Sequence, residues 1–231
     1  MKVLCVVPVH ARTEFINEAL LSLVRQTRTI DEVVVTGNLL PSEIDVDLLA
    51  CVARRSVHEI NGHLLHDRLN SVIGRSDCEA YFVLADDDRV KPNFVERTAT
   101  AIESADIAFT NYAHFGDDDT VIEAGPWSSI ESANTLPVTA LVRKSVWEKV
   151  RGYQPVVYFD WDFWWRCWVA GASASHIAEP LFEYRRHAGQ TGSTMPLDKA
   201  ELLVQRYRER LRSTGKLTGD PAIYDEVVSA A

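Results

Sequence analysis

The sequence has few cysteines, no excess of positive charge and no pairing motif among its thiols. Its four cysteines, Cys5, Cys51, Cys78 and Cys167, form no C-x-x-C pair and no cluster of the kind that holds zinc. We therefore expect reduced thiols and a cytoplasmic protein. The formal net charge is −9, from 33 acidic and 24 basic residues, so a nucleic-acid-binding surface is not expected.

Long apolar segments are also missing. No run reaches the roughly 18 apolar residues of a transmembrane helix, so we expect no membrane span. Residues 2–7 faintly resemble the start of a signal peptide, but the apolar run is short and Pro8 interrupts it. An amphipathic helical pattern follows, which favours a first core strand.

Short apolar runs alternate with helical patterns over the first hundred residues. Such alternation predicts an α/β fold, in which helices flank a mostly parallel sheet. Ligands of these sheets bind beyond the carboxyl ends of the strands. The expected strands are 3–9, 33–36, 56–60, 80–85, 106–113, 137–142 and one or two strands within 173–184; the expected helices include 45–54, 143–150 and those starting near Phe15, Leu65, Pro92, Asp160 and Leu202.

Three adjacent carboxylates, Asp86, Asp87 and Asp88, follow the apolar strand expected at 80–85. Carboxylates this close repel one another, so they need a cation or hydrogen-bond donors nearby. Hard divalent ions bind through one or two carboxylates together with substrate phosphates. The alternative is a solvated turn, but the buried strand before the triplet and Pro92 after it favour a metal site.

A second triplet, Asp117-Asp118-Asp119, serves as an internal control. It has the same composition, but Phe115-Gly116 precedes it and no buried strand leads into it. We interpret it as the tip of a hairpin.

Asp160 opens a tryptophan-rich segment at the expected start of a helix, where the helix dipole favours an ionised carboxylate. Either Asp160 or Asp162 could act as a general base, although Asp162 has the i,i+4 spacing for an ion pair with Arg166. Trp161 could stack on a sugar ring. Core packing is expected of Trp164, Trp165 and Trp168.

The segment Tyr184-Arg185-Arg186-His187 precedes a loop of glycines and hydroxyl residues that includes Ser193. Arginine forks suit phosphate oxygens, and a neutral histidine can bind a metal. The glycines would let residues 188–195 close over a ligand as a lid. A flexible basic loop is the alternative.

Together these segments resemble glycosyltransferase family 2, which has the GT-A fold, in order from residue 2 to about 194. The matching segments are Val6-Val7-Pro8-Val9-His10-Ala11-Arg12, Ser22-Leu23-Val24-Arg25-Gln26-Thr27, Arg68-Leu69-Asn70, the D-x-D motif Asp86-Asp87-Asp88, Gly152-Tyr153 with Asp160-Trp161-Asp162 and Arg166, and Tyr184-Arg185-Arg186-His187.

The resemblance implies one GT-A domain over 1–231, with a small second sheet. It divides into a nucleotide-sugar-binding half (1–111), an acceptor and catalytic half (112–195) and a helical tail (196–231). The implied activity is metal-assisted transfer of a sugar, with inversion, from a nucleoside-diphosphate sugar to a glycan or another hydroxyl acceptor. A UDP-sugar is the favoured donor.

The resemblance also implies a role for each matched residue. Asp160 would be the catalytic base, and Trp161 and Asp162 would face the acceptor. Asp88, Asp86 and His187 would hold Mn²⁺ or Mg²⁺, while Arg185, Arg186 and Ser193 would contact the diphosphate. The nucleotide sugar would be bound by Pro8, Val9, His10, Arg12, Thr36, Arg68, Asp86 and Asp87.

Two departures from the family pattern leave alternatives open. Thr36 stands in the second-strand motif where the family usually has an acidic residue, and Phe159 stands before Asp160 where it often has glutamate. An inactive nucleotide- or glycan-binding protein is one alternative. A sugar nucleotidyltransferase is another, although residues 8–14 lack the glycines of its phosphate loop. A carbohydrate-binding module would be richer in β-structure.

Overall fold

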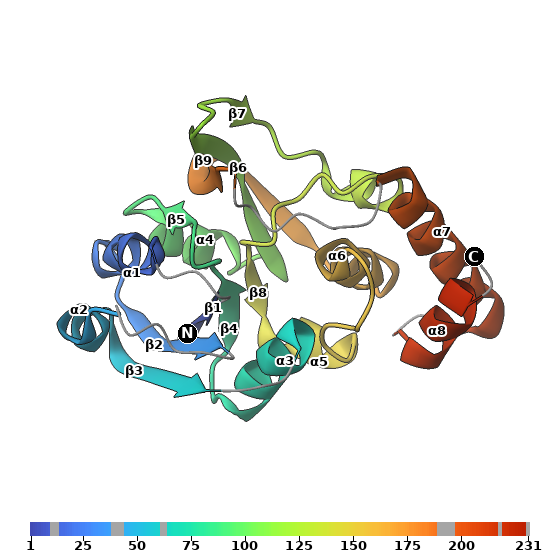
Figure 1. Ribbon diagram of the computed structural model, residues 1–231, viewed down its shortest axis with the longest axis horizontal. Helices are drawn as coiled ribbons and strands as arrows, with labels where there is room; N and C mark the ends of the chain where they lie inside the picture. The colour runs from blue at the N-terminus through green and yellow to red at the C-terminus, as the bar shows by residue number, and fades with distance from the viewer. Residues whose placement is uncertain (10–13, 38–43, 61–63, 189–196, 217–218, 230–231) are drawn as a thin grey trace.

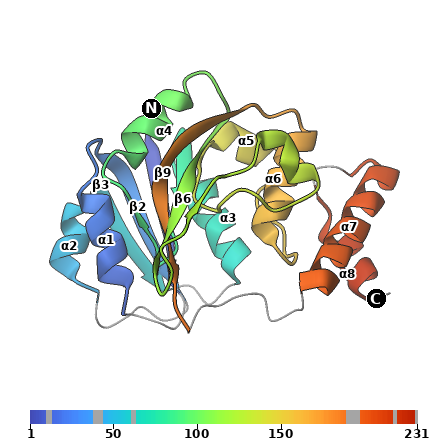
Figure 2. The same cartoon turned by 90° about the horizontal axis from the view of Figure 1, so that it is seen from above.

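The computed structural model describes residues 1–231 except 10–13, 38–43, 61–63, 189–196, 217–218 and 230–231, and except the side chains of 46, 49, 54–60 and 197–200. The described chain contains a nine-stranded sheet in the order β3-β2-β1-β4-β8-β6-β9-β5, with β7 paired to β6. Helices cover both faces of this sheet (Figures 1 and 2).

The first part of the sheet is parallel, as the sequence predicts. The strands β1 (Val3–Val9), β2 (Ile30–Gly37), β3 (Ala53–Ile60) and β4 (Ala80–Val83) alternate with the helices α1 (Ile16–Val24), α2 (Val46–Cys51) and α3 (Leu65–Arg75). The expected strands and helices of this half are confirmed, except that the last two residues of the helix expected at 45–54 belong to β3.

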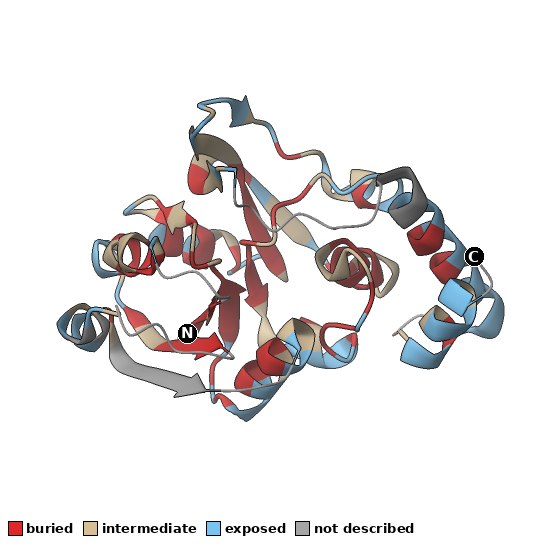
Figure 3. Ribbon diagram, viewed as in Figure 1, coloured by how far each residue is buried: buried red, intermediate tan, exposed pale blue. Residues whose placement is uncertain are grey.

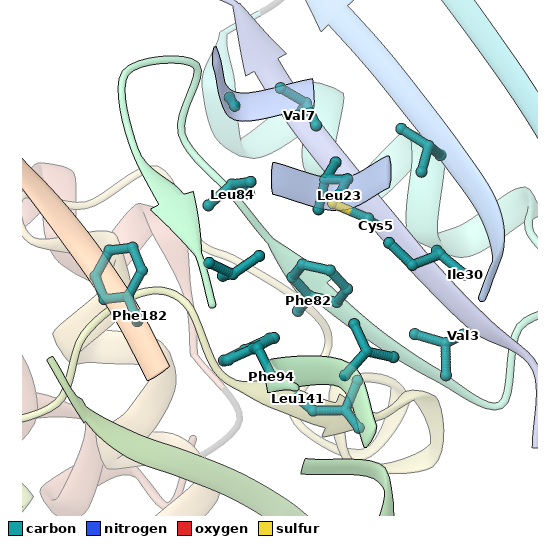
Figure 4. Close-up of a cluster of buried hydrophobic side chains, with 14 of the residues drawn as sticks. Val3, Cys5, Val7, Leu23, Ile30, Phe82, Leu84, Phe94, Leu141 and Phe182 are labelled. Atoms are coloured by element: carbon teal, nitrogen blue, oxygen red, sulfur yellow. The ribbon is translucent and has the colours of Figure 1, made fainter. Parts of the chain in front are cut away.

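The strand β1 is buried on both faces, which explains its unbroken apolar run. Val3, Cys5 and Val7 face α1 in one core cluster, and Leu4 and Val6 face α3 in another. Figure 4 shows the first cluster, and Figure 3 shows how burial concentrates along the central strands. The N-terminal segment is therefore the core strand that its pattern favours.

The second part of the sheet reverses direction at β8, which is antiparallel to both β4 and β6, whereas β6 and β9 are parallel. The remaining elements are β5 (Arg89–Val90), α4 (Phe94–Ala101), β6 (Ile107–Gly116), β7 (Val121–Ile122), the 3₁₀ helix η1 (Trp127–Glu131), β8 (Leu141–Arg143), α5 (Lys144–Lys149), α6 (Phe159–Val169), β9 (Ala174–Arg186), α7 (Leu197–Thr214) and α8 (Pro221–Ser229).

Two sequence expectations differ from the structure in this half. The strand expected at 137–142 is confined to β8, because the segment before it, which includes Pro137, forms a loop. The segment 173–184, where one or two strands were expected, forms the single strand β9, whose register against β6 shifts around Asn111. The short elements β5, β7 and η1, and the helix α8, were not expected, since none of them has a long periodic pattern.

The C-terminal helices pack on α6 through its tryptophans. Trp164 and Trp165 are fully buried, as expected, and Trp165 joins a cluster with Tyr207, Leu211 and Ile223. Arg208 of α7 lies 4.3 Å over the Trp161 ring and 5.0 Å over the Trp165 ring. In the described part of the chain, no helix has both the length and the apolar character needed to cross a membrane.

Asn70 of α3 joins its own segment, Arg68-Leu69-Asn70, to the segment Gly152-Tyr153, which lies more than 80 residues later in the chain. Its amide nitrogen donates to the Tyr153 carbonyl at 2.8 Å, and its amide oxygen accepts from the Tyr153 N–H at 2.8 Å. Gly152 lies beside this contact with a φ of 67°, and an added Cβ would stand 2.3 Å from the Asn70 oxygen. Asn70 and Gly152 therefore have a structural role, which is to hold the segment that leads into α6.

We predict that Gly152→Ala lowers the free energy of unfolding by more than about 3 kcal/mol, because it combines a strained φ with a steric clash. Gly171→Ala is the matched control: its φ is 76°, but nothing lies within 4 Å of the added Cβ. The control should cost only about 1 kcal/mol. Urea unfolding measures the free energy of unfolding of both variants. Equal losses of stability would show that the close contact of Gly152 with Asn70 is unimportant.

Candidate active site

A cleft of about 770 Å³ opens at the carboxyl ends of the parallel strands. It brings together the ends of β1 and β4, the β6–β9 strand pair, the loop before β8 and the start of α6. The lining residues are Pro8, Val9, Leu65, Arg68, Ala85, Asp86, Asp87, Asp88, Tyr112, His114, Asn134, Leu136, Pro137, Val138, Val157, Tyr158, Phe159, Asp160, Phe182, Tyr184 and Arg186.

The acidic triplet occupies the turn after β4. Asp86 and Asp88 are buried, and Asp88 is only 2% exposed. The backbone N–H of Arg185 donates to Asp88 Oδ1 at 2.9 Å. Burial raises the pKa of Asp88 well above its usual value, and the neighbouring carboxylates Asp87 and Asp86 raise it further. The ionised form of Asp88 is therefore costly here, and a cation beside it would reduce that cost.

His187 lies next to this turn. Its Nε2 is 3.2 Å from Asp87 Oδ2. Within the described residues, no group of three or more His, Cys, Asp or Glu side chains is arranged to hold a metal by itself. Mg²⁺ and similar ions are compatible with this arrangement, because they commonly use one or two carboxylates and take their other ligands from phosphate and water.

Asp160 lines the same cleft from the first turn of α6. The helix begins after Tyr158, which has the left-handed φ of 51°. Burial raises the pKa of Asp160, while the Trp161 backbone N–H and Asn134 act in the opposite direction. The Asn134 amide donates to Asp160 Oδ2 at 3.3 Å. Asn134 was missed because a single asparagine in a loop carries no sequence signal.

The far end of the cleft lies between β1 and α3. Pro8, Val9 and Arg68 line it, as the sequence predicts. The Arg68 guanidinium donates to the Val9 carbonyl at 3.2 Å and to the Thr36 carbonyl at 3.4 Å. Burial lowers the pKa of Arg68, and Asp86 partly offsets this effect. Arg68 is thereby held at the boundary between β1, β2 and the acidic turn.

Some predicted nucleotide-binding residues are not at the cleft surface. Thr36 is fully buried, and its hydroxyl has no hydrogen-bond partner among the described residues. Thr36 contributes its backbone carbonyl to Arg68 but does not line the cleft. His10, Arg12 and Ser193 lie outside the described residues.

The two arginines at the end of β9 point to opposite faces of the sheet, because neighbouring strand residues alternate. Arg186 lines the cleft, together with Tyr184 on the same face. The Arg185 guanidinium instead lies 4.1 Å over Phe15 and 4.2 Å over Phe115, and it pairs with Glu18. The structure therefore corrects the expectation that the Arg185 side chain contacts a diphosphate.

The two residues after Asp160 belong to the core and not to an acceptor surface. Trp161 is 3% exposed, and its indole N–H donates to the Ile130 carbonyl at 2.8 Å. Asp162 is 1% exposed and pairs with Arg166 at 2.8 Å, as the i,i+4 spacing predicts. Neither lines the cleft. This corrects the expectation that they contact the acceptor, because each residue along an α-helix is rotated by about 100°, which turns both side chains away from the face of Asp160.

The structure is similar to that of TarS from S. aureus. The complex of TarS 1-349 with UDP-GlcNAc gives a TM-score of 0.73 at 16% sequence identity, over 98% of this chain and 70% of that one. The complex of TarS 1-349 with UDP gives 0.70 at 15% identity, over 98% and 69%. A longer TarS structure gives 0.70 at 15% identity, over 99% of this chain and 42% of that one.

The similarity to TarS confirms the expected α/β fold of GT-A type. The sequence itself matches no protein-family model and no curated protein. At this level of identity the shared feature is the fold, and the roles of the residues in the cleft have to be argued from their own geometry.

We predict that Arg185→Ala lowers the free energy of unfolding by about 2 kcal/mol, because it removes two cation–π contacts and a charge-assisted hydrogen bond. Arg186→Ala is the matched neighbour on the cleft face. It should change stability by less than about 0.5 kcal/mol. Urea denaturation measures the free energy of unfolding of the two variants. Equal losses of stability would contradict the assignment of Arg185 and Arg186 to opposite faces of the sheet.

Proposed function

We propose that this protein transfers a sugar from a nucleoside-diphosphate sugar to a hydroxyl acceptor, with inversion at the anomeric carbon. The observation that carries the proposal is that the acidic turn at Asp86–Asp88 and the Asp160 carboxylate line one cleft. These residues are more than 70 positions apart, and only the fold brings them together. The fold of TarS, which binds UDP-GlcNAc and UDP in the complexes above, supports a nucleotide-sugar ligand.

The nucleoside end of the donor fits between β1 and α3. Pro8, Val9 and Leu65 offer an apolar surface there, and Arg68 supplies a positive charge beside Asp86. A nucleoside placed at this end extends its diphosphate toward the acidic turn. We favour a UDP-sugar. A thermal-shift screen of UDP-, GDP-, CDP- and dTDP-sugars, with and without Mn²⁺, would identify the donor.

The donor atoms at the acidic turn fit a hard divalent cation. Asp88 and Asp86 supply carboxylate oxygens, and His187 lies against Asp87 at the same turn. Bound there, Mg²⁺ or Mn²⁺ would stabilise the negative charge that develops on the departing diphosphate. The buried Asp88, whose ionised form is destabilised by its surroundings, is the residue that gains most from such an ion.

Asp160 is suited to accept the proton of the acceptor hydroxyl. In a single displacement, the acceptor oxygen forms a bond to the anomeric carbon while the bond to the diphosphate breaks, which inverts the configuration. The hydroxyl proton passes to an Asp160 carboxylate oxygen. The Asn134 amide, bonded to Oδ2, fixes the orientation of that carboxylate and opposes the effect of burial on its pKa.

We predict that Asp160→Asn reduces kcat by about 10²- to 10⁴-fold, because an amide cannot accept the proton. The affinity for the donor should stay within about twofold. Asp119→Asn, an exposed substitution of the same kind outside the cleft, is the control and should retain full turnover. Steady-state assays measure kcat, and calorimetry measures the affinity for the donor. Unchanged turnover in Asp160→Asn would exclude this residue as the base.

A second prediction concerns the metal. In the wild type, the nucleoside diphosphate should bind at least tenfold more tightly with Mn²⁺ than with EDTA. In Asp88→Ala this difference should disappear, because the buried carboxylate is the main ligand. Calorimetry with UDP, or with the diphosphate that the screen selects, provides the measurement. Equal wild-type affinities with Mn²⁺ and with EDTA would contradict a metal role.

A further inference from the structure

The hairpin between β6 and β7 contains His114, which lines the cleft, and the second acidic triplet, Asp117–Asp119. Asp117–Asp119 does form the hairpin tip that the sequence predicts. Its middle residue is nevertheless distinct from the other two, because Asp118 Oδ2 lies 2.5 Å from His114 Nδ1. Asp117 and Asp119 are exposed, whereas Asp118 is half-buried. The structure thus separates three residues that the sequence makes equivalent.

Asp118 is held as an ionised carboxylate. Its Oδ1 accepts a hydrogen bond from the Thr120 hydroxyl at 2.7 Å and from the Thr120 backbone N–H at 3.1 Å. These bonds and the one from His114 lower the pKa of Asp118 to about 2. A fixed anion at this position holds His114 Nδ1 and so fixes the plane of the His114 ring.

The His114 ring is thereby oriented with one nitrogen still available. Nδ1 is taken by Asp118, and no described residue hydrogen-bonds Nε2. His114 lines the cleft, and its ring lies 5.8 Å from that of Tyr112 and 5.7 Å from that of Tyr184. A protonated His114 could donate from Nε2 to an anion in the cleft.

The Arg186 guanidinium lies on the same face of the sheet as His114. In the parallel pairing of β6 with β9, His114 stands opposite Tyr184, and Gly116 stands opposite Arg186. The Arg186 guanidinium lies 6.0 Å from the centre of the Tyr184 ring and also lines the cleft. Among the described residues, no carboxylate forms an ion pair with Arg186, so its charge is available to a ligand.

His114 and Arg186 are separate from the nucleoside end of the cleft. The sheet order places β1 and β2 on one side of β4, and places β6 and β9 on the other side beyond β8 (Figure 1). The acidic turn after β4 lies between the two regions. A nucleoside between β1 and α3 therefore leaves the β6–β9 wall to the diphosphate or to the acceptor.

We propose that His114, oriented by Asp118, and Arg186 form a phosphate-binding site on the β6–β9 wall of the cleft. The phosphate belongs either to the donor diphosphate or to a phosphorylated acceptor, and in both cases a protonated imidazole and a guanidinium bind its oxygens. The proposal extends the proposed sugar transfer by assigning a ligand to this wall, but its test does not require turnover.

The experiment titrates the protein with inorganic phosphate in EDTA while the ring signals of His114 are followed by NMR. The wild type should show saturable shifts. Calorimetry, which does not need the His114 signal, should show that His114→Gln and Asp118→Asn bind phosphate at least tenfold more weakly than the wild type. Asp119→Asn removes the same charge from the same hairpin tip and should stay within twofold of the wild type. Circular dichroism checks that each variant is folded.

The two sources of phosphate are separated by comparing UDP with UMP in EDTA. If the donor diphosphate occupies the site, His114→Gln weakens the binding of UDP but not of UMP. If an acceptor phosphate occupies the site, UDP binds the wild type and His114→Gln equally, and inorganic phosphate still shifts the His114 signals in the presence of UDP.

The proposal is overturned if phosphate leaves the His114 signals of the wild type unchanged, or if Asp118→Asn and Asp119→Asn bind phosphate equally. Loss of sugar transfer alone would bear on the proposed function and not on this site.

Discussion

The acidic turn is fixed by one hydrogen bond between two distant strand ends, the one from the Arg185 backbone N–H to the buried Asp88 carboxylate. It holds the turn after β4 against the end of β9, beside the antiparallel pairing of β5 with β9. The stacked Arg185 side chain holds the same strand end against α1. Because the first contact joins a backbone N–H to a buried carboxylate, the acidic turn has a defined place in the cleft.

Strand alternation then divides the side chains of the β6–β9 pair between two tasks. Residues on one face, among them Phe115 and Arg185, build the contact with α1, while those on the other face, among them His114 and Arg186, line the cleft. Helical rotation makes a similar division in α6, where Asp160 faces the cleft and Asp162 is buried with Arg166. Neighbours in the sequence thus have separate structural and chemical roles.

The main elements of the fold were predictable because their signals are local. The buried run of β1, the amphipathic pattern of α1 and the acidic turn after β4 each lie within one short segment. The elements that were missed, such as β5 and α8, have too few residues or too weak a period to stand out. Candidates in the cleft were found where a chemical motif met a strand or helix end, as at Asp88 and Asp160, and were missed where a single polar residue stood in a loop, as at Asn134.

The sequence by itself determined the parallel α/β framework, the acidic cluster at a strand end and the position of Asp160 at the start of a helix, because periodicity and capping act over a few neighbouring residues. Only the tertiary structure decided which of two adjacent arginines faces the cleft and which of three identical aspartates, Asp118, holds His114. Those choices depend on strand register and hairpin geometry, which are set by contacts between distant segments.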